Sequence, residues 1–145
     1  MRNLAGKRYW LVGASAGLGR SVALELSRMG VHVILSARNA AELEALAKEC
    51  PGSSDVVPVD IADDESVAQA AEQIGDVDGV VFLAGVYWPM KAADWNPSQV
   101  TAMFDINLTG AARVLGHVVP KMVARNSGHI VLTGSLSGFR GLPGA

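Results

Sequence analysis

The sequence predicts an α/β domain with a doubly wound parallel sheet in strand order 3-2-1-4-5. Short apolar runs alternate with segments of helical apolar spacing, a glycine-rich turn follows the first run, and polar or glycine residues follow the others. Strands joined through helices pair in parallel by right-handed crossovers. Ligands of such sheets bind beyond the carboxyl ends of the strands, which is where the turn and the polar residues fall.

The strands are expected at the five apolar runs, near residues 8–12, 31–35, 55–59, 77–83 and 129–133. Three helical segments separate the first four runs, and each has one apolar stripe that we assign to the core: Leu18, Val22, Leu26 and Met29; Ala40, Leu43, Leu46 and Ala47; Val67, Ala70, Ala71 and Ile74. Gly30 is expected to end the first helix, and Asp63 is expected to cap the third.

A long fourth helix is expected from about Pro97 to Ala124, because proline suits a first helical turn. Its stripe would be Leu108, Ala111, Leu115, Val118 and Met122. Pro120 should kink this helix.

Composition narrows the class of protein. The chain has 145 residues, half of them hydrophobic, which suits one domain over residues 1–145. A net charge of -2 with dispersed Lys and Arg gives no footprint for nucleic acid. Residues 79–90 form the longest uncharged apolar stretch, too short to span a bilayer, and the N-terminus lacks an apolar signal core. We therefore expect a cytoplasmic protein with no nucleic-acid or membrane partner.

The cysteine and the histidines offer no metal site. Cys50 is the single cysteine, and His32, His117 and His129 lie far apart without ligand spacing. Their simplest interpretation is a structural or surface role.

The turn from Gly13 to Gly19 joins a strand to a helix and predicts a diphosphate site. Diphosphate oxygens approach backbone N–H groups closely, and the helix N-terminus adds donors and a favourable dipole. Glycine removes the Cβ atoms that would block this approach. The residues after the other strands, Arg38, Asp60, Ala84, Gly85 and Ser135, should reach the same edge of the sheet.

The glycine spacing GxxxGxG resembles that of the short-chain dehydrogenase/reductase family, and the resemblance covers essentially the whole chain. Supporting pieces are Asp60-Ile61, Leu83-Ala84-Gly85, Asp105-Ile106-Asn107-Leu108 and the run from His129 to Ser135. Two departures are Val12, where the family often has threonine, and Phe82-Leu83, where it usually has asparagines. The resemblance implies a Rossmann-like fold and an N-terminal part of such a protein.

The resemblance implies a set of cofactor-binding residues: Gly13, Ser15, Ala16, Gly17, Leu18 and Gly19 near the diphosphate, Asp60 and Ile61 near the adenine, and Ala84 and Gly85 after the fourth strand. Ser15 can also be a helix-capping serine, and Asp60 a solvated turn aspartate. NADP is favoured over NAD, because Ser36-Ala37-Arg38-Asn39 contains no acid to repel a 2′-phosphate and Arg38 can bind one. A solvated charge is the alternative for Arg38, and Ala16 supplies no second basic group.

For catalysis, the resemblance implies hydride transfer between nicotinamide and a small alcohol or carbonyl substrate. Ser135 matches the serine that orients the substrate oxygen, with Ser137 as a weaker candidate. Asn107 matches a helix asparagine whose local distortion lets a backbone carbonyl hold water. The alternatives are a plain turn serine and a mid-helix asparagine that faces solvent.

The tyrosine and lysine of the family's Tyr-x-x-x-Lys pair are expected beyond Ala145, so the chain is predicted to lack this pair and to be inactive alone. Tyr9 and Tyr87 are not expected to replace the tyrosine, because they lie in the first strand and in the loop after the fourth. The full-length form is expected to be a homo-oligomer.

The second hypothesis is a nucleotide-binding or redox-sensing module without turnover. Hydrolase chemistry fails on spacing, because Leu136 occupies the middle of the Gly134–Gly138 pentapeptide. A phosphoryl-transfer loop fails because Arg20-Ser21 follow Gly19.

Overall fold

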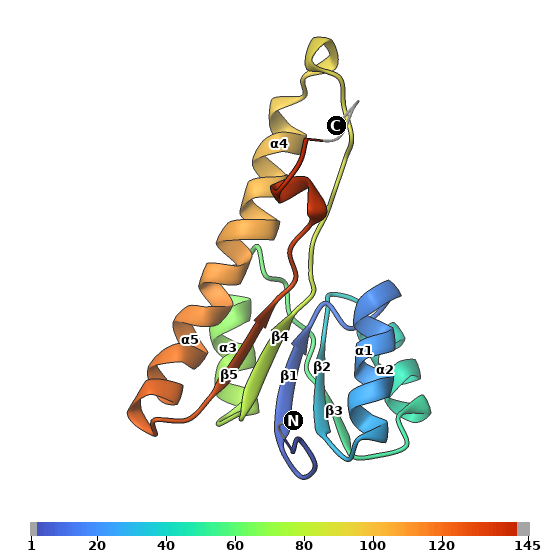
Figure 1. Ribbon diagram of the computed structural model, residues 1–145, viewed down its shortest axis with the longest axis vertical. Helices are drawn as coiled ribbons and strands as arrows, with labels where there is room; N and C mark the ends of the chain where they lie inside the picture. The colour runs from blue at the N-terminus through green and yellow to red at the C-terminus, as the bar shows by residue number, and fades with distance from the viewer. Residues whose placement is uncertain (1–2, 142–145) are drawn as a thin grey trace.

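A computed structural model describes residues 3–141 and shows one parallel five-stranded sheet in the order β3-β2-β1-β4-β5 (Figure 1). The strands are β1 (Arg8–Val12), β2 (His32–Ser36), β3 (Ser54–Val56), β4 (Gly79–Phe82) and β5 (His129–Leu132). Each neighbouring pair is parallel. The predicted fold class and strand order are confirmed.

Helices cover both faces of the sheet. The helices α1 (Gly17–Arg28) and α2 (Ala40–Glu49) lie on one face, and α3 (Asp64–Ile74) and α5 (Gly110–Ala124) lie on the other (Figure 1). The helix α4 (Pro97–Phe104) is joined to α5 by a π-helical turn, η2 (Asp105–Thr109), so that the three form one long rod that projects past the sheet. Short 3-10 turns lie at Ala92–Asp94 (η1) and Leu136–Gly138 (η3).

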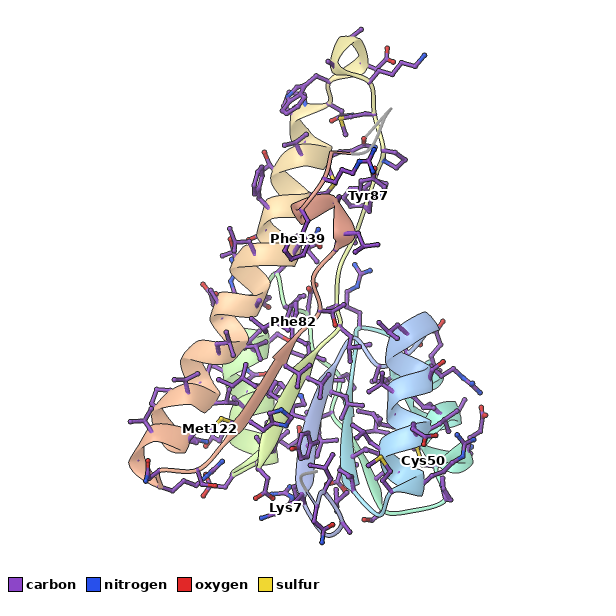
Figure 2. All side chains as sticks on the ribbon, viewed as in Figure 1. Lys7, Cys50, Phe82, Tyr87, Met122 and Phe139 are labelled. Atoms are coloured by element: carbon purple, nitrogen blue, oxygen red, sulfur yellow. The ribbon has the colours of Figure 1, made fainter. Side chains whose placement is uncertain are left out.

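The strands separate two hydrophobic cores, because successive side chains point to opposite faces. Trp10 and Val12 lie in the core against α3 and α5, together with Phe82 and Met122 (Figure 2). Leu11 lies in the core against α1 and α2. Within residues 3–141 no helix is long and apolar enough to cross a bilayer.

Several local expectations hold. The stripe of α3 is buried as predicted, and Asp63 caps this helix by accepting a hydrogen bond from the Glu65 N–H (3.0 Å). Pro97 is in the first turn of α4, behind an Asn96 cap. Gly30 follows α1 with φ of 79°. Pro120 lies inside α5, which continues to Ala124, and the kink stays a prediction.

The stripe predicted for the first helix is partly wrong. Leu18 and Met29 are 60% and 45% exposed, whereas the buried positions of α1 are Gly19, Ala23 and Ser27. Small side chains bring this helix close to the sheet, so the larger Val22 and Leu26 pack only at its flanks.

Leu108, which was expected in the stripe of the fourth helix, is 65% exposed. It lies in η2, and a π turn adds a residue to the helical repeat. The buried stripe of α5 consequently runs through Gly110, Val114, Val118 and Met122.

The third expected strand is shorter than predicted. β3 ends at Val56, although Val57 N–H still donates to Leu35 C=O (3.0 Å) and Val59 N–H to Ala37 C=O (3.0 Å). Both valines are buried, so apolar patterning continued past the end of the regular strand. The fourth strand likewise begins at Gly79 and not at 77.

Candidate functional site

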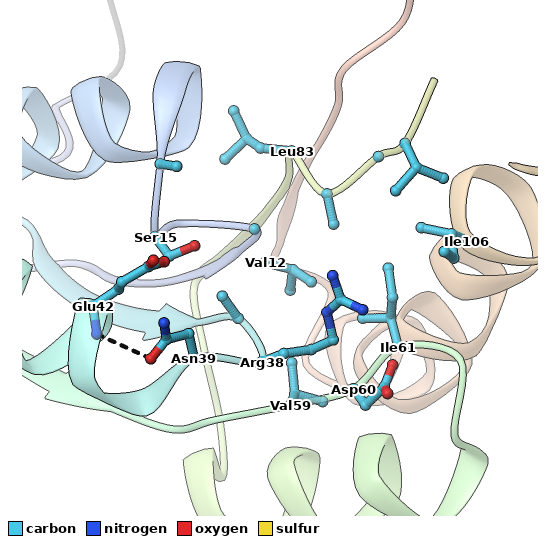
Figure 3. Close-up of a pocket in the computed structure, with 16 residues that line it drawn as sticks. Val12, Ser15, Arg38, Asn39, Glu42, Val59, Asp60, Ile61, Leu83 and Ile106 are labelled. Carbon is cyan, nitrogen blue, oxygen red and sulfur yellow. Dashed lines mark hydrogen bonds between the residues drawn. The ribbon is translucent and has the colours of Figure 1, made fainter. Parts of the chain in front are cut away.

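A cleft of about 680 Å³ lies at the carboxyl ends of β1, β2 and β4 (Figure 3). Eight of the predicted cofactor-binding residues line it: Gly13, Ser15, Ala16, Arg38, Asp60, Ile61, Ala84 and Gly85. The remaining three, Gly17, Leu18 and Gly19, are not among its lining residues and form the first turn of α1. The topology therefore brings most of the predicted set together.

The glycine turn is closed tightly against its surroundings. Gly13 has φ of 93°, and a Cβ atom there would lie 2.6 Å from Ala84 Cα. Its N–H donates to Ser36 C=O (2.7 Å), which also accepts the Ala14 N–H (3.0 Å). A Cβ atom on Gly19 would overlap the carbonyl oxygen of Gly13. These two glycines thus hold the strand, the turn and the helix at contact distance.

Ser15 is not the cap of α1. The capping position is Ala16, which has no side chain able to accept a hydrogen bond. The Ser15 side chain lies in the cleft (Figure 3), so the capping alternative for this serine is wrong. The first N–H groups of any α-helix have no partner within the helix. Those of α1 come directly after Ser15 and Ala16, which line the cleft.

Arg38 follows β2 and extends its guanidinium into the cleft (Figure 3). No ion pair or side-chain hydrogen bond joins it to any other residue in the described part of the chain. Asn39 next to it caps α2 by accepting the Ala41 N–H (3.1 Å). The cleft therefore contains a cation whose donors are not used by a carboxylate.

Glu42 also lines this cleft, and the sequence reasoning missed it. The absence of an acid was judged over the four residues after the strand, but the first turn of α2 brings Glu42 back to the same space. Helical spacing from Asn39 to Glu42 was the available signal.

Asp60 and Ile61 form the floor of the cleft on the side of α3. Asp60 accepts the Ala62 N–H through Oδ1 (3.0 Å), and its own N–H donates to Ser66 Oγ (3.0 Å). Ile61 is only 7% exposed and packs under Gly110, where a Cβ atom would lie 3.0 Å from Ile61 Cδ1. The loop is fixed by both polar and apolar contacts.

Asn107 lies in the π-helical turn η2, where the helix departs from α geometry. Its Oδ1 accepts the Val86 N–H and its Nδ2 donates to the Val86 C=O, both at 2.8 Å. Asn107 is exposed, as the alternative expected, but its side chain is also hydrogen-bonded to the backbone. This pair of hydrogen bonds ties the segment after β4 to the long helix.

Ser135 lies at a second cleft of about 760 Å³ that also includes Asn107 and Ser137. Its Oγ accepts the Ser137 N–H (3.2 Å) and lies 2.7 Å from Ser137 Oγ. The other lining residues are mostly apolar: Tyr87, Trp88, Pro89, Met90, Ala92, Trp95, Val100, Met103, Phe104, Leu108 and Gly138. The hydroxyls thus border an apolar space.

The expectation that the chain lacks a Tyr-x-x-x-Lys pair needs a correction, because Tyr87 and Lys91 have this spacing. They lie before Ser135, in a segment without regular structure that contains Pro89. Residues four apart share one face of a helix but not of an extended chain. Tyr87 and Lys91 therefore do not form a helical pair.

The described groups with a shifted pKa do not line the nucleotide cleft. Within residues 3–141, no three His, Cys, Asp or Glu side chains are grouped as a metal ion would require. Burial raises the pKa of the thiol of Cys50, the residue that follows α2. The described carboxyl group with a lowered pKa is Asp78, where the Arg8 N–H is the main cause. Asp78 lies at the opposite edge of the sheet.

The fold and the cleft define a dinucleotide-binding α/β domain, and comparison with known proteins places it in a family. Residues 7–145 match the family model described as short chain dehydrogenase. An uncharacterized oxidoreductase of Myxococcus xanthus is 38% identical, over 99% of this chain and 60% of its own length. L-xylulose reductase of Mesocricetus auratus is 36% identical, over 96% of this chain and 57% of its own.

A solved structure agrees. A metagenomic short-chain oxidoreductase in complex with NADP superimposes with a TM-score of 0.90 at 28% identity, covering 97% of this chain and 67% of that one. The chain described here belongs to the short-chain dehydrogenase family. It spans about 60% of the length of the M. xanthus relative.

Proposed function

We propose that the chain forms the cofactor-binding part of an NADP-dependent oxidoreductase that transfers hydride between nicotinamide and an alcohol or carbonyl substrate. The observation that carries the proposal is the guanidinium of Arg38, which has no ion pair or side-chain hydrogen bond within residues 3–141 and lies in a cleft bordered by the Gly13 turn. Guanidinium binds phosphate oxygens through a planar fork of donors. A 2′-phosphate would give Arg38 the anionic partner that it lacks among the described residues.

The residues divide the cofactor between them. Gly13, Ser15 and the first turn of α1, which begins at Gly17, would hold the diphosphate through N–H groups and a hydroxyl. Asp60 and Ile61 would border the adenine. Glu42 opposes a 2′-phosphate by charge, so the preference for NADP depends on Arg38 outweighing it.

The substrate would lie in the apolar cleft beside Ser135. Bound nicotinamide supplies or accepts the hydride, and the Ser135 hydroxyl would orient the substrate oxygen by a hydrogen bond. Asn107 would keep the π turn in place through Val86, because its amide oxygen and its amide nitrogen both bond to the backbone of that residue. General acid-base assistance is worth roughly 10²- to 10⁴-fold and needs a proton donor of suitable pKa. We do not assign this role to Tyr87, and we propose that the chain alone does not turn over substrate.

The experiment is isothermal titration of the full chain with NADP⁺ and NAD⁺. NADP⁺ should bind more tightly, and Arg38→Ala should weaken NADP⁺ binding about tenfold or more while changing NAD⁺ binding little. Lys48→Ala, which removes a cation of α2 that does not line the cleft, is the matched control. Equal binding of both cofactors by wild type and Arg38→Ala would contradict the NADP preference.

A nucleotide-binding or redox-sensing module without turnover is the alternative, and the same titration would be positive for it. An assay of the natural gene product with NADPH and a panel of carbonyl compounds distinguishes the two, because only the oxidoreductase would consume NADPH. The cytoplasmic location and the homo-oligomeric state stay predictions.

A further inference from the structure

Arg113 of α5 bridges three separate segments of the chain. Its Nη1 donates to the carbonyl oxygen of Ile61 (3.1 Å) and to Asp105 Oδ1 (2.9 Å), and its Nε donates to Asp64. The side chain is 20% exposed, so the guanidinium is largely enclosed by these partners. One planar group therefore contacts the loop after β3, the start of α3 and the π turn.

These segments carry residues of the nucleotide cleft. Ile61 lines the cleft directly, and its carbonyl is held by Arg113. Asp105 begins the π turn that contains Asn107, whose amide binds Val86, another lining residue. Arg113 thus lies behind the cleft, between the Asp60–Ile61 side and the Val86 side, without lining it.

The geometry requires an arginine. Three acceptors on different segments are reached by three N–H groups of one rigid plane, whereas an ammonium is a compact charge on a flexible stem. The pKa of Arg113 is raised, mainly by the hydrogen bond to Asp105, so the cation persists at all ordinary pH values. Lysine at this position would keep the charge and lose the simultaneous contacts.

We propose that Arg113 is a positioning residue that fixes the Asp60–Ile61 loop to the π turn and so keeps the adenosine side of the cleft in its binding shape. The inference rests on the proposed cofactor function. It deepens that function by assigning a role to a residue that does not touch the cofactor.

Arg125, at the end of the same helix, provides the matched control. It donates to the Ser127 carbonyl (3.0 Å) and to the Val77 carbonyl, and it pairs with Asp76 (3.6 Å). This is a comparable clamp of α5 to the sheet, but at the edge away from the cleft. Loss of either clamp should lower stability, and only loss of Arg113 should affect the nucleotide.

The test compares Arg113→Lys, Arg113→Met and Arg125→Met in the full chain, with adenosine 2′,5′-bisphosphate as the titrated probe. Both Arg113 variants should bind it about tenfold more weakly than wild type, and Arg125→Met should bind it normally. Hydrogen exchange of the Ala62 amide, which donates to Asp60, should be faster in the Arg113 variants only. If Arg113→Met does not fold, Arg113→Lys decides alone.

The outcomes separate the two proposals. Unchanged probe affinity in Arg113→Lys, beside a loss in Arg38→Ala, would overturn the positioning role and leave the cofactor function standing. An equal loss in Arg125→Met would reduce the effect to general destabilisation and overturn the role as well. Failure of wild type to bind the probe, NADP⁺ and NAD⁺ would overturn both.

Discussion

The two edges of the sheet have clefts of nearly equal size, about 680 Å³ at the carboxyl ends of the strands and about 670 Å³ at the amino ends. Size therefore does not distinguish them. At the amino edge the charged groups are paired: Lys7 binds Asp78, and Arg8 donates to the Asp76 and Ile74 carbonyls. At the carboxyl edge Arg38 stays without a described partner. The proposed function therefore lies at the edge where a cation has no bonded partner among residues 3–141.

Contacts between backbone atoms separate the edges further. The turn at the carboxyl edge needs Gly13 at φ of 93° and allows no Cβ at Gly13 or Gly19. At the amino edge Gly6, Gly30 and Gly75 also have positive φ, but a Cβ on Gly79 would meet the ring of Tyr9 and not backbone. A turn that lacks Cβ atoms at Gly13 and Gly19 would permit the close approach of a diphosphate to backbone N–H groups.

The largest predicted effect is a loss of stability on substitution of a glycine at the carboxyl edge. Gly19→Ala should destabilise the chain by more than about 3 kcal/mol, because the new Cβ would overlap the Gly13 carbonyl, which is backbone and has little freedom to move. Thermal unfolding followed by circular dichroism measures the loss. Gly116→Ala is the control, since a Cβ there meets nothing within 4 Å and alanine favours a helix by up to about 1 kcal/mol. A variant Gly19→Ala as stable as wild type would show that the turn is not closed as described.

A smaller effect is predicted at Ser36, the last residue of β2. Its Oγ accepts the Trp10 Nε1–H (2.8 Å) and donates to the Val57 carbonyl (2.5 Å), and both Ser36 and Trp10 are fully buried. Ser36→Ala should cost about 2 kcal/mol, because a buried donor and acceptor lose their partner. Chemical denaturation measures it. Ser135→Ala, at an exposed serine, should stay within about 0.5 kcal/mol.

A double-mutant cycle sharpens this prediction. Trp10→Phe removes the indole donor, so the cost of Ser36→Ala should be smaller in that background than in wild type. Strictly additive losses would mean that the Trp10–Ser36 hydrogen bond contributes nothing to the free energy of unfolding.

The sequence was sufficient to predict which residues lie at each edge of the sheet. Apolar runs that alternate with helical segments indicate parallel strands, and the residues after each run then lie at the carboxyl edge. It was insufficient where backbone proximity, and not apolar size, decides burial: α1 packs through Gly19, Ala23 and Ser27 while Leu18 is exposed. The spacing of apolar residues did not indicate that residues 105–109 would form a π turn. A π turn adds one residue to the helical repeat, and in the sequence this looks the same as a slightly irregular apolar stripe. Glu42 was missed because only residues 36–39 were considered for an acid, and Glu42 lies three positions further along, in the first turn of α2.

The smallest predicted effect is at Asp78 on the amino edge. Its carboxylate accepts the Arg8 N–H (2.9 Å) and the Lys7 ammonium (3.1 Å), which lower its pKa against the opposing effect of burial. A carboxyl whose pKa falls on folding stabilises the chain above its unfolded pKa, about 3.9, and this contribution is lost as pH falls through the folded value. Because the side chain is 38% exposed, solvent screening keeps the contribution below about 1 kcal/mol.

Asp78→Asn should therefore lower the melting temperature slightly near pH 7, and the difference from wild type should disappear as pH falls through the lowered pKa of the folded state. Asp94→Asn, at an exposed carboxylate of η1, should show no such difference at either pH. NADP⁺ affinity should be unchanged in Asp78→Asn, because Asp78 pairs with Lys7 and does not line the nucleotide cleft. A loss of cofactor binding comparable to that of Arg38→Ala would mean that the two edges are coupled through the sheet, and the division of roles drawn from Arg38 and Asp78 would then fail.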